Sequence, residues 1–119
     1  MRKLLSLLYS VCLLFLFCIL LGGGRARAAE TFVSCTPVQV MTYQGRVHVR
    51  CSAAVGGIVF FAVSTQDTAF AARVLSLLTT AQVAGRTITI LFDPADLSGA
   101  AIGCQNSDCR LIRAVGFGQ

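Results

Sequence analysis

The sequence predicts a small domain that is mainly β with one helix, with its elements in the order β-β-β-α-β-β. Three observations lead to this fold class. Apolar residues alternate with polar ones over residues 46–52 and 86–92, which is the period of a strand. Apolar residues recur at helical spacing over residues 68–84. Turn-forming residues, glycine above all, separate these segments.

The first 28 residues predict a signal peptide that is removed on export. Arg2 and Lys3 precede an apolar stretch at 4–21, three glycines follow it, and Ala26 and Ala28 fit a signal-peptidase site. The stretch has 18 residues, about the shortest length that spans a hydrocarbon core, so a retained membrane anchor is the alternative. We expect cleavage, a periplasmic or secreted mature chain, and no stable membrane span afterwards.

The charge of the mature chain argues against a nucleic-acid partner. The whole sequence has a formal net charge of +5, but four of its ten basic residues lie within residues 1–28. Residues 29–119 therefore carry six basic residues against five acidic ones. Nucleic-acid binding needs a clustered basic surface to neutralise phosphates. We expect a single, nearly neutral domain over residues 29–119, which is long enough for one core.

The first half of this domain predicts three strands. Residues 31–43 are rich in β-branched and aromatic side chains, and Gln44 and Gly45 supply a turn. The next segment, 46–52, predicts a half-buried strand. Its alternation places two sets of side chains on opposite faces, Val47, Val49 and Cys51 on one and Arg46, His48 and Arg50 on the other. Residues 58–64 form a nearly continuous apolar run, typical of a central strand buried on both faces.

The second half predicts the helix and two more strands. Asp67 is a short acceptor that can cap the helix at 68–84, and Gly85 can end it in the left-handed conformation. Strands are expected at 86–92 and 110–117. Five strands with a helix between the third and the fourth are the order of a small OB-fold-like barrel.

Export makes the four cysteines after residue 28 a disulfide framework. Four cysteines permit three pairings. Cys104 and Cys109 enclose a short polar turn that closes easily, which leaves Cys35 to pair with Cys51. A structural zinc is not expected, because four ligands are needed and the cysteines come with a single histidine. No cofactor is predicted.

Part of the chain resembles the B subunits of pertussis-like and subtilase-like AB toxins. The resemblance covers residues 59–113 and rests on an A-V-S strand that leads into a long helix, a strand bounded by Gly85, and the C-x4-C pair near the C-terminus. It implies an OB-fold subunit that forms a ring, a pentamer, binds glycans including sialylated ones, and has an enzymatic A subunit as partner. The family builds its sugar sites from Ser, Tyr and Lys, whereas residues 29–119 contain one tyrosine and no lysine. The resemblance therefore assigns no sugar-binding residue.

Arg46, His48 and Arg50 are the candidate ligand-binding residues. They share one face of one predicted strand, and a planar guanidinium matches the two oxygens of a carboxylate. We expect them to bind an acidic glycan, more tightly as His48 becomes protonated around its reference pKa of ~6.5. The alternative interpretation is the solvated face of an edge strand, where charge prevents edge pairing.

No catalytic site is predicted. A histidine-dependent enzyme needs a nucleophile beside His48, but the cysteines are expected to be paired and no G-x-S-x-G occurs. Asp93, Asp96 and Asp108 are interpreted as turn and loop residues rather than as calcium ligands or acid–base groups. The sequence thus predicts an exported, non-catalytic, glycan-binding subunit. The alternatives are a monomeric periplasmic accessory or binding protein without a toxin partner, and a membrane-tethered envelope component.

Overall fold

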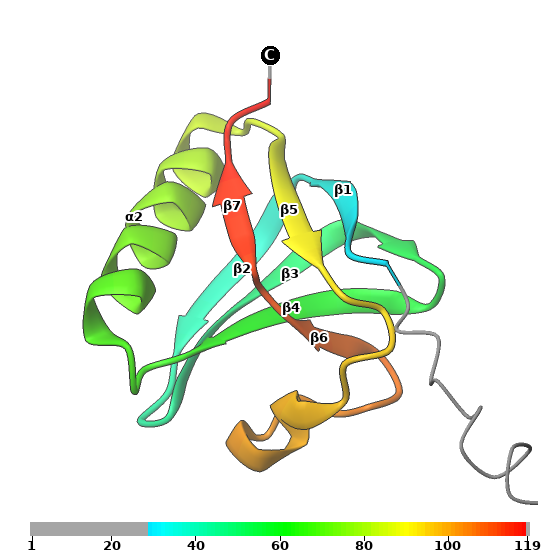
Figure 1. The fold of residues 1–119 in the computed structure, drawn as a ribbon. Coiled ribbons are helices and arrows are strands. Elements are labelled where there is room, and N and C mark those ends of the chain that lie inside the picture. The colour runs from blue at the N-terminus through cyan, green and yellow to red at the C-terminus, as the bar shows by residue number, and fades with distance from the viewer. Residues whose placement is uncertain (1–28, 119) are drawn as a thin grey trace, which may run out of the picture.

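The computed structural model describes residues 29–118, in which seven strands form two sheets beside one α-helix (Figure 1). One sheet has the strand order β1-β5-β7 and the other β2-β3-β4-β6. The strands are β1 (Thr31–Cys35), β2 (Pro37–Thr42), β3 (Arg46–Val55), β4 (Ile58–Ser64), β5 (Ile88–Phe92), β6 (Cys109–Leu111) and β7 (Ala114–Gly116). The helices are α2 (Thr68–Ala84) and a 3-10 helix, η1 (Ser98–Ile102). The predicted fold class, mainly β with one helix, is confirmed, and the predicted signal peptide lies outside the described residues.

The predicted first strand is divided between the two sheets. The chain bends at Thr36, so that β1 pairs with β5 and β2 pairs with β3, both antiparallel. Pro37 starts β2, a position where its missing N–H costs no ladder hydrogen bond. Strands commonly change sheets by such bends at the corners of packed sheets. The expectation of one continuous strand over residues 31–43 was therefore wrong, because a composition rich in β-branched and aromatic residues predicts strand but carries no information about a corner.

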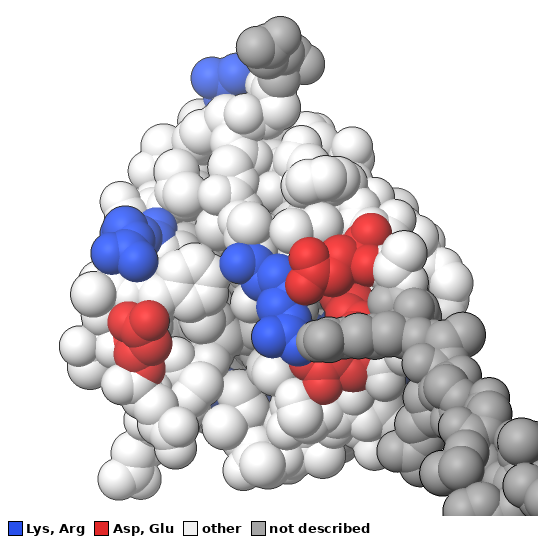
Figure 2. Space-filling model, viewed as in Figure 1, with Lys and Arg blue, Asp and Glu red and all other residues white. Residues whose placement is uncertain are grey.

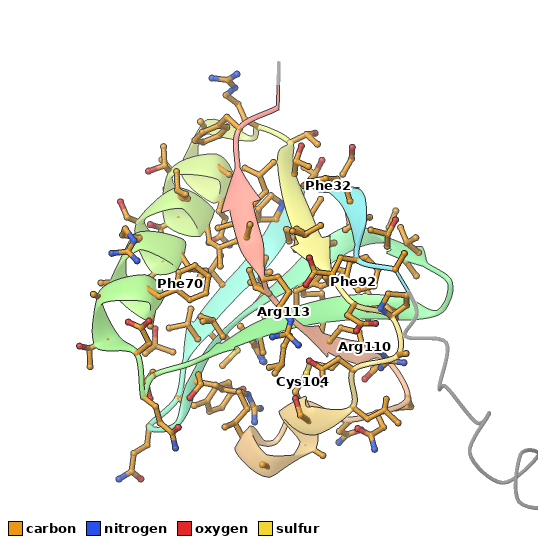
Figure 3. All side chains as sticks on the ribbon, viewed as in Figure 1. Phe32, Phe70, Phe92, Cys104, Arg110 and Arg113 are labelled. Atoms are coloured by element: carbon orange, nitrogen blue, oxygen red, sulfur yellow. A yellow bond between two sulfur atoms is a disulfide. The ribbon has the colours of Figure 1, made fainter. Side chains whose placement is uncertain are left out.

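The predicted last strand is divided in the same way. The Ile112 N–H donates to the Ala62 carbonyl in β4 (2.7 Å), and the Arg113 N–H donates to the Leu91 carbonyl in β5 (2.8 Å). Two consecutive residues therefore bond to different sheets. β6 runs parallel to β4, whereas β7 runs antiparallel to β5. In Figure 3, Arg113 marks the point where the chain passes from β6 to β7.

The core lies between the two sheets and α2. Phe61 of β4 meets Phe92 of β5 edge to face, with ring centroids 5.1 Å apart, so this pair joins the sheets. In β5 the predicted alternation holds, since Ile88, Ile90 and Phe92 are buried. The strand begins two residues later than expected, at Ile88 rather than Arg86.

The helix begins and ends at the predicted residues. The Asp67 carboxylate accepts from the Phe70 N–H (2.9 Å), and Gly85 adopts φ 62° while its N–H donates to the Ala81 carbonyl. α2 packs mainly on β2 and also contacts β3, β4 and β7. Its buried side chains are Ala71, Val74, Leu78 and Ala81. Within residues 29–118, no helix is long and apolar enough to cross a membrane.

The structure contains the two expected disulfides. The Cys35–Cys51 bridge joins the end of β1 to the middle of β3, with the two Cα atoms 5.2 Å apart. The Cys104–Cys109 bridge closes the polar turn between η1 and β6. Both pairs are consistent with an oxidising, exported environment.

Leu78→Asp is expected to unfold the domain. Leu78 is fully buried against the sheets, and an unpaired carboxylate there costs several kcal/mol, comparable with the ~5 kcal/mol total stability of a small domain. The helical spacing of apolar residues predicts that Leu77 lies in the middle of the buried face, but Leu77 is only half-buried, so Leu77→Asp should cost less than Leu78→Asp. Thermal unfolding followed by circular dichroism checks both variants, with the exposed Ser76→Asp as control. Equal melting temperatures for Leu78→Asp and Ser76→Asp would contradict this packing of α2.

Candidate functional site

The outer face of β3 carries the candidate residues of the sequence analysis. Val47, Val49 and Cys51 point into the core and are 2%, 0% and 3% exposed, as the alternation predicts. Arg46, His48 and Arg50 therefore share the opposite face. β3 lies between β2 and β4, so it is a central strand and not an edge strand.

The three residues on that face have different surroundings, which corrects the expectation of an open basic face. Arg46 is half-buried, His48 is only 9% exposed, and Arg50 is exposed. Arg46 and His48 share a cavity with residues from the 103–109 segment, and Arg50 does not line it. Alternation along β3 cannot reveal this difference in burial, because the 103–109 segment that causes it is distant from β3 in the sequence.

Arg46 is held in place by three contacts. Its Nη1 donates to the Ile102 carbonyl at the end of η1 (2.6 Å), and its guanidinium carbon lies 4.4 Å from the centre of the Tyr43 ring. Gly103 makes this approach possible, because a Cβ built there would lie 2.0 Å from Arg46 Nη1. Gly103 also has φ +83°, a conformation that glycine adopts readily. The Nε of Arg46 is buried and has no hydrogen-bond partner among the described residues.

His48 lies between two aromatic rings. The Tyr43 ring meets it edge to face at 5.0 Å, and the Phe60 ring lies at 5.5 Å on β4. Burial, and secondly the charge of Arg46, hold the pKa of His48 below its ordinary value of 6.5. The imidazole is thus mainly neutral at neutral pH. Its Nε2 is buried and finds no partner within residues 29–118.

These side chains border a cavity of about 190 Å³. β3 and β4 supply one wall, and the segment that follows η1 supplies the other. The lining residues are Arg46, His48, Phe60, Gly103, Gln105, Asp108 and Cys109. An engineered cavity of ~150 Å³ holds a benzene molecule, so this one has room for a single six-membered ring.

The second wall is anchored at both ends. The Val59 and Phe60 N–H groups both donate to the Asp108 carbonyl (3.0 Å each), which ties the segment to β4. The Cys104–Cys109 bridge closes the segment on itself, and Cys104, labelled in Figure 3, is only 3% exposed. The cavity wall is therefore a short covalently closed turn rather than an open loop.

Sequence reasoning missed most of this second wall. Gly103, Gln105 and Asp108 carry no motif, and Asp108 was interpreted as a solvated loop residue. Phe60 was assigned to the core, whereas it is half-buried and lines the cavity. One signal was available, because alternation along β4 puts Phe60 on the face opposite the buried Phe61.

Asp93 and Asp96 are turn residues, as predicted. The Asp93 carboxylate accepts from the Ala95 N–H, and the Asp96 carboxylate accepts from the Ser98 N–H, both at 2.9 Å. Hydrogen bonds from Ser98 hold the pKa of Asp96 below 3.8. Among residues 29–118, no three His, Cys, Asp or Glu side chains gather closely enough to hold a metal ion.

Charged side chains are sparse on the face that Figure 2 shows, and blue and red groups lie beside one another near its centre. Arg113 and Asp96 form an ion pair, with the Nη2 and Oδ2 atoms 2.5 Å apart. Comparisons with protein-family models, curated proteins and solved structures find no match for this chain.

The pKa of His48 is expected to lie below 6.5 in the folded protein, since burial and Arg46 both disfavour the imidazolium. A pH titration of its ring protons by NMR measures this directly, because the sequence contains one histidine. In Arg46→Gln the pKa should rise part of the way, as burial, the larger cause, remains. A pKa at or above 6.5 in the unaltered protein would contradict the described burial.

The same shift predicts how stability depends on pH. In the unfolded chain His48 takes up its proton at a higher pH than in the folded protein, so the free energy of unfolding should fall as the pH drops below ~6.5. His48→Phe should remove this loss between pH 7 and pH 5. The contribution of Asp96 lies in a separate window, because its stabilisation is lost only below about pH 4. Urea unfolding at several pH values checks both windows, and an unchanged slope in His48→Phe would count against the assignment.

Gly103→Ala and Gly57→Ala form a matched pair. Both glycines have φ +83°, so both substitutions incur the ~1–2 kcal/mol cost of a left-handed alanine. Nothing lies within 4 Å of a Cβ at Gly57, whereas at Gly103 the Arg46 guanidinium must move. We expect a larger loss of stability for Gly103→Ala, together with a raised His48 pKa. Urea unfolding and the NMR titration measure these effects, and equal costs with an unchanged His48 pKa would refute the proposed packing of Arg46.

Proposed function

We propose that this chain is an exported, non-catalytic binding protein with an OB-type barrel, whose cavity over β3 and β4 takes one sugar ring of a glycan. One observation carries the proposal. Arg46 and His48 line the same cavity, and Arg46 Nε and His48 Nε2 are buried without a partner among the described residues. Buried polar groups in folded proteins nearly always have a hydrogen-bond partner. A ligand oxygen would supply it.

The strand pairing supports a five-stranded barrel. β1 and β2 follow one another through Thr36, and β6 and β7 follow one another through residues 112–113. When each of these pairs is counted as one bent strand, the seven strands become five. Pairing then leads from β2 through β3, β4 and β6 to β7, and from β7 through β5 back to β1. This order of neighbours is the one expected of an OB-type barrel, and it supports the proposed fold.

The place of the cavity also supports binding. OB-type barrels bind oligosaccharides and oligonucleotides on the face of their second and third strands, between flanking loops. In this count the second and third strands are β3 and β4, and the segment between β5 and β6 supplies the flanking residues. This support is an analogy at the level of the fold, so the chemistry of the cavity decides the ligand.

The lining suits a sugar. Phe60 offers an aromatic wall for the apolar side of a ring, while Arg46 and His48 offer donors to its oxygens. Gln105 and Asp108 bring acceptors for hydroxyl groups to the same cavity. Catalysis is not proposed, because the sulfur of Cys109 is held in a disulfide and cannot act as a nucleophile.

The partners of this binding protein are proposed from the resemblance to AB-toxin B subunits. They are further copies of the chain, arranged as a ring, and an enzymatic A subunit. The alternatives are a monomer of the same fold, and a tethered form that keeps the apolar stretch at 4–21. The mass in solution distinguishes ring from monomer, and the intact mass of exported protein shows whether residues 1–28 remain.

A glycan-array screen of the exported, oxidised protein tests the proposed function. We expect retention on a restricted set of glycans, and we expect His48→Phe to lose it. That variant keeps an aromatic ring between Tyr43 and Phe60 but removes the nitrogen, so its fold should be preserved.

Arg50→Ala is the control for this screen. Arg50 lies on the same strand and the same face, two residues from His48, but it is exposed and does not line the cavity. The Arg50→Ala variant should therefore still be retained on the same glycans. Retention that disappears in Arg50→Ala and persists in His48→Phe would refute a site in this cavity.

A further inference from the structure

The Arg46 guanidinium has one edge engaged and one edge free. Its Nη1 is occupied by the Ile102 carbonyl. Its Nε is buried without a partner, and no hydrogen bond of its Nη2 occurs within residues 29–118. Nε and Nη2 together form the side edge of a guanidinium, and their two N–H groups point in parallel. A carboxylate binds such an edge with two parallel hydrogen bonds.

This edge is fixed before any ligand arrives. The Ile102 carbonyl and Gly103 both lie against Nη1, and the Tyr43 ring lies 4.4 Å from the guanidinium carbon, so two separate segments of the chain restrict the guanidinium. Ordering a long side chain normally costs binding free energy. Here that cost is already met during folding, so little ordering of the Arg46 side chain is left for a ligand to impose.

His48 adds a third donor without adding a charge. Its imidazole is neutral at neutral pH, and in the Nε2–H tautomer it donates one hydrogen bond. The titratable and charged groups around it are Arg46 on its own strand, Tyr43 in the turn before β3, and Asp108 on the opposite wall. The cavity lining therefore carries one cationic and one anionic side chain.

We infer that the cavity selects a carboxylate monoanion, with the Nε–Nη2 edge of Arg46 taking its two oxygens and His48 donating beside them. The inference rests on the proposed function and narrows it to sugars of the uronate type. A dianion such as a phosphate monoester would meet the same single arginine and the Asp108 carboxylate as well. Arg50, exposed and outside the cavity, has no part in this selection.

Calorimetric titration of the exported, oxidised protein at pH 7.5 tests the inference with four probes. These are D-glucuronate, its uncharged methyl ester, D-glucose and glucose 6-phosphate, which is largely a dianion at this pH. We expect glucuronate to bind at least ~10-fold more tightly than the other three, because only it combines one negative charge with a planar two-oxygen group. These four titrations need no variant, so they do not depend on how a substitution folds.

A matched pair of variants locates the selectivity. Arg46→Lys keeps the charge but loses the planar edge, and it should reduce the preference for glucuronate over its methyl ester by ~10-fold. Arg50→Lys makes the same change at the exposed position on the same strand and should leave the preference unchanged. Thermal unfolding of both variants reports whether they are folded before titration.

The possible results distinguish a failure of carboxylate selection from a failure of sugar binding itself. Binding of none of the four probes would overturn the inference, and an empty glycan array would overturn the proposed function with it. Equal affinity for glucose and glucuronate would leave sugar binding standing and overturn carboxylate selection. Tighter binding of glucose 6-phosphate, or a preference that survives Arg46→Lys, would also overturn the inference.

Discussion

The cavity over β3 and β4 depends on one constraint, which is that β3 is covered on both of its faces. Its inner face packs into the core through Val47 and Val49, which are almost fully buried. Its outer face would be an ordinary solvated surface if the segment after η1 did not close over Arg46 and His48. That closure takes two polar side chains out of water, and burial of polar groups is costly unless they find partners. We propose a binding site here because Arg46 Nε and His48 Nε2 have no hydrogen-bond partner among the described residues.

The closing segment is held by local chemistry. Gly103 permits a backbone turn against the Arg46 guanidinium, the Cys104–Cys109 bridge shortens the turn, and the Asp108 carbonyl accepts two hydrogen bonds from β4. The segment also buries apolar atoms, because Cys104 and Cys109 pack with Ala62 in a small hydrophobic cluster, so apolar contacts position it together with directional and covalent ones. Directional contacts define geometry more narrowly than apolar packing does, which suits a wall that faces a ligand.

Local patterns in the sequence were sufficient for elements whose cause is local. Asp67 and Gly85 define the ends of α2 through the groups they donate and accept, and spacing alone led to the Cys104–Cys109 bridge. Residues whose role depends on distant contacts could not be predicted. The bend at Thr36 follows from the pairing of β1 with β5, in which Cys35 lies opposite Ile88, more than 50 residues later in the sequence. The burial of His48 follows from the 103–109 segment, which is just as distant in the sequence. The pKa of His48 was expected at its reference value for the same reason, because burial, the larger cause of the shift, cannot be read from alternation.

The central claim is that Arg46, and not the exposed Arg50, presents the ligand-binding edge. Proton–nitrogen NMR spectra of the arginine Nε–H groups, recorded while D-glucuronate is added to the exported, oxidised protein, test it most directly. If Arg46 presents this edge, its Nε–H signal shows a large, saturable shift while the Arg50 signal does not move. A shift confined to Arg50, or an Arg46 signal that does not respond while glucuronate binds, would contradict it.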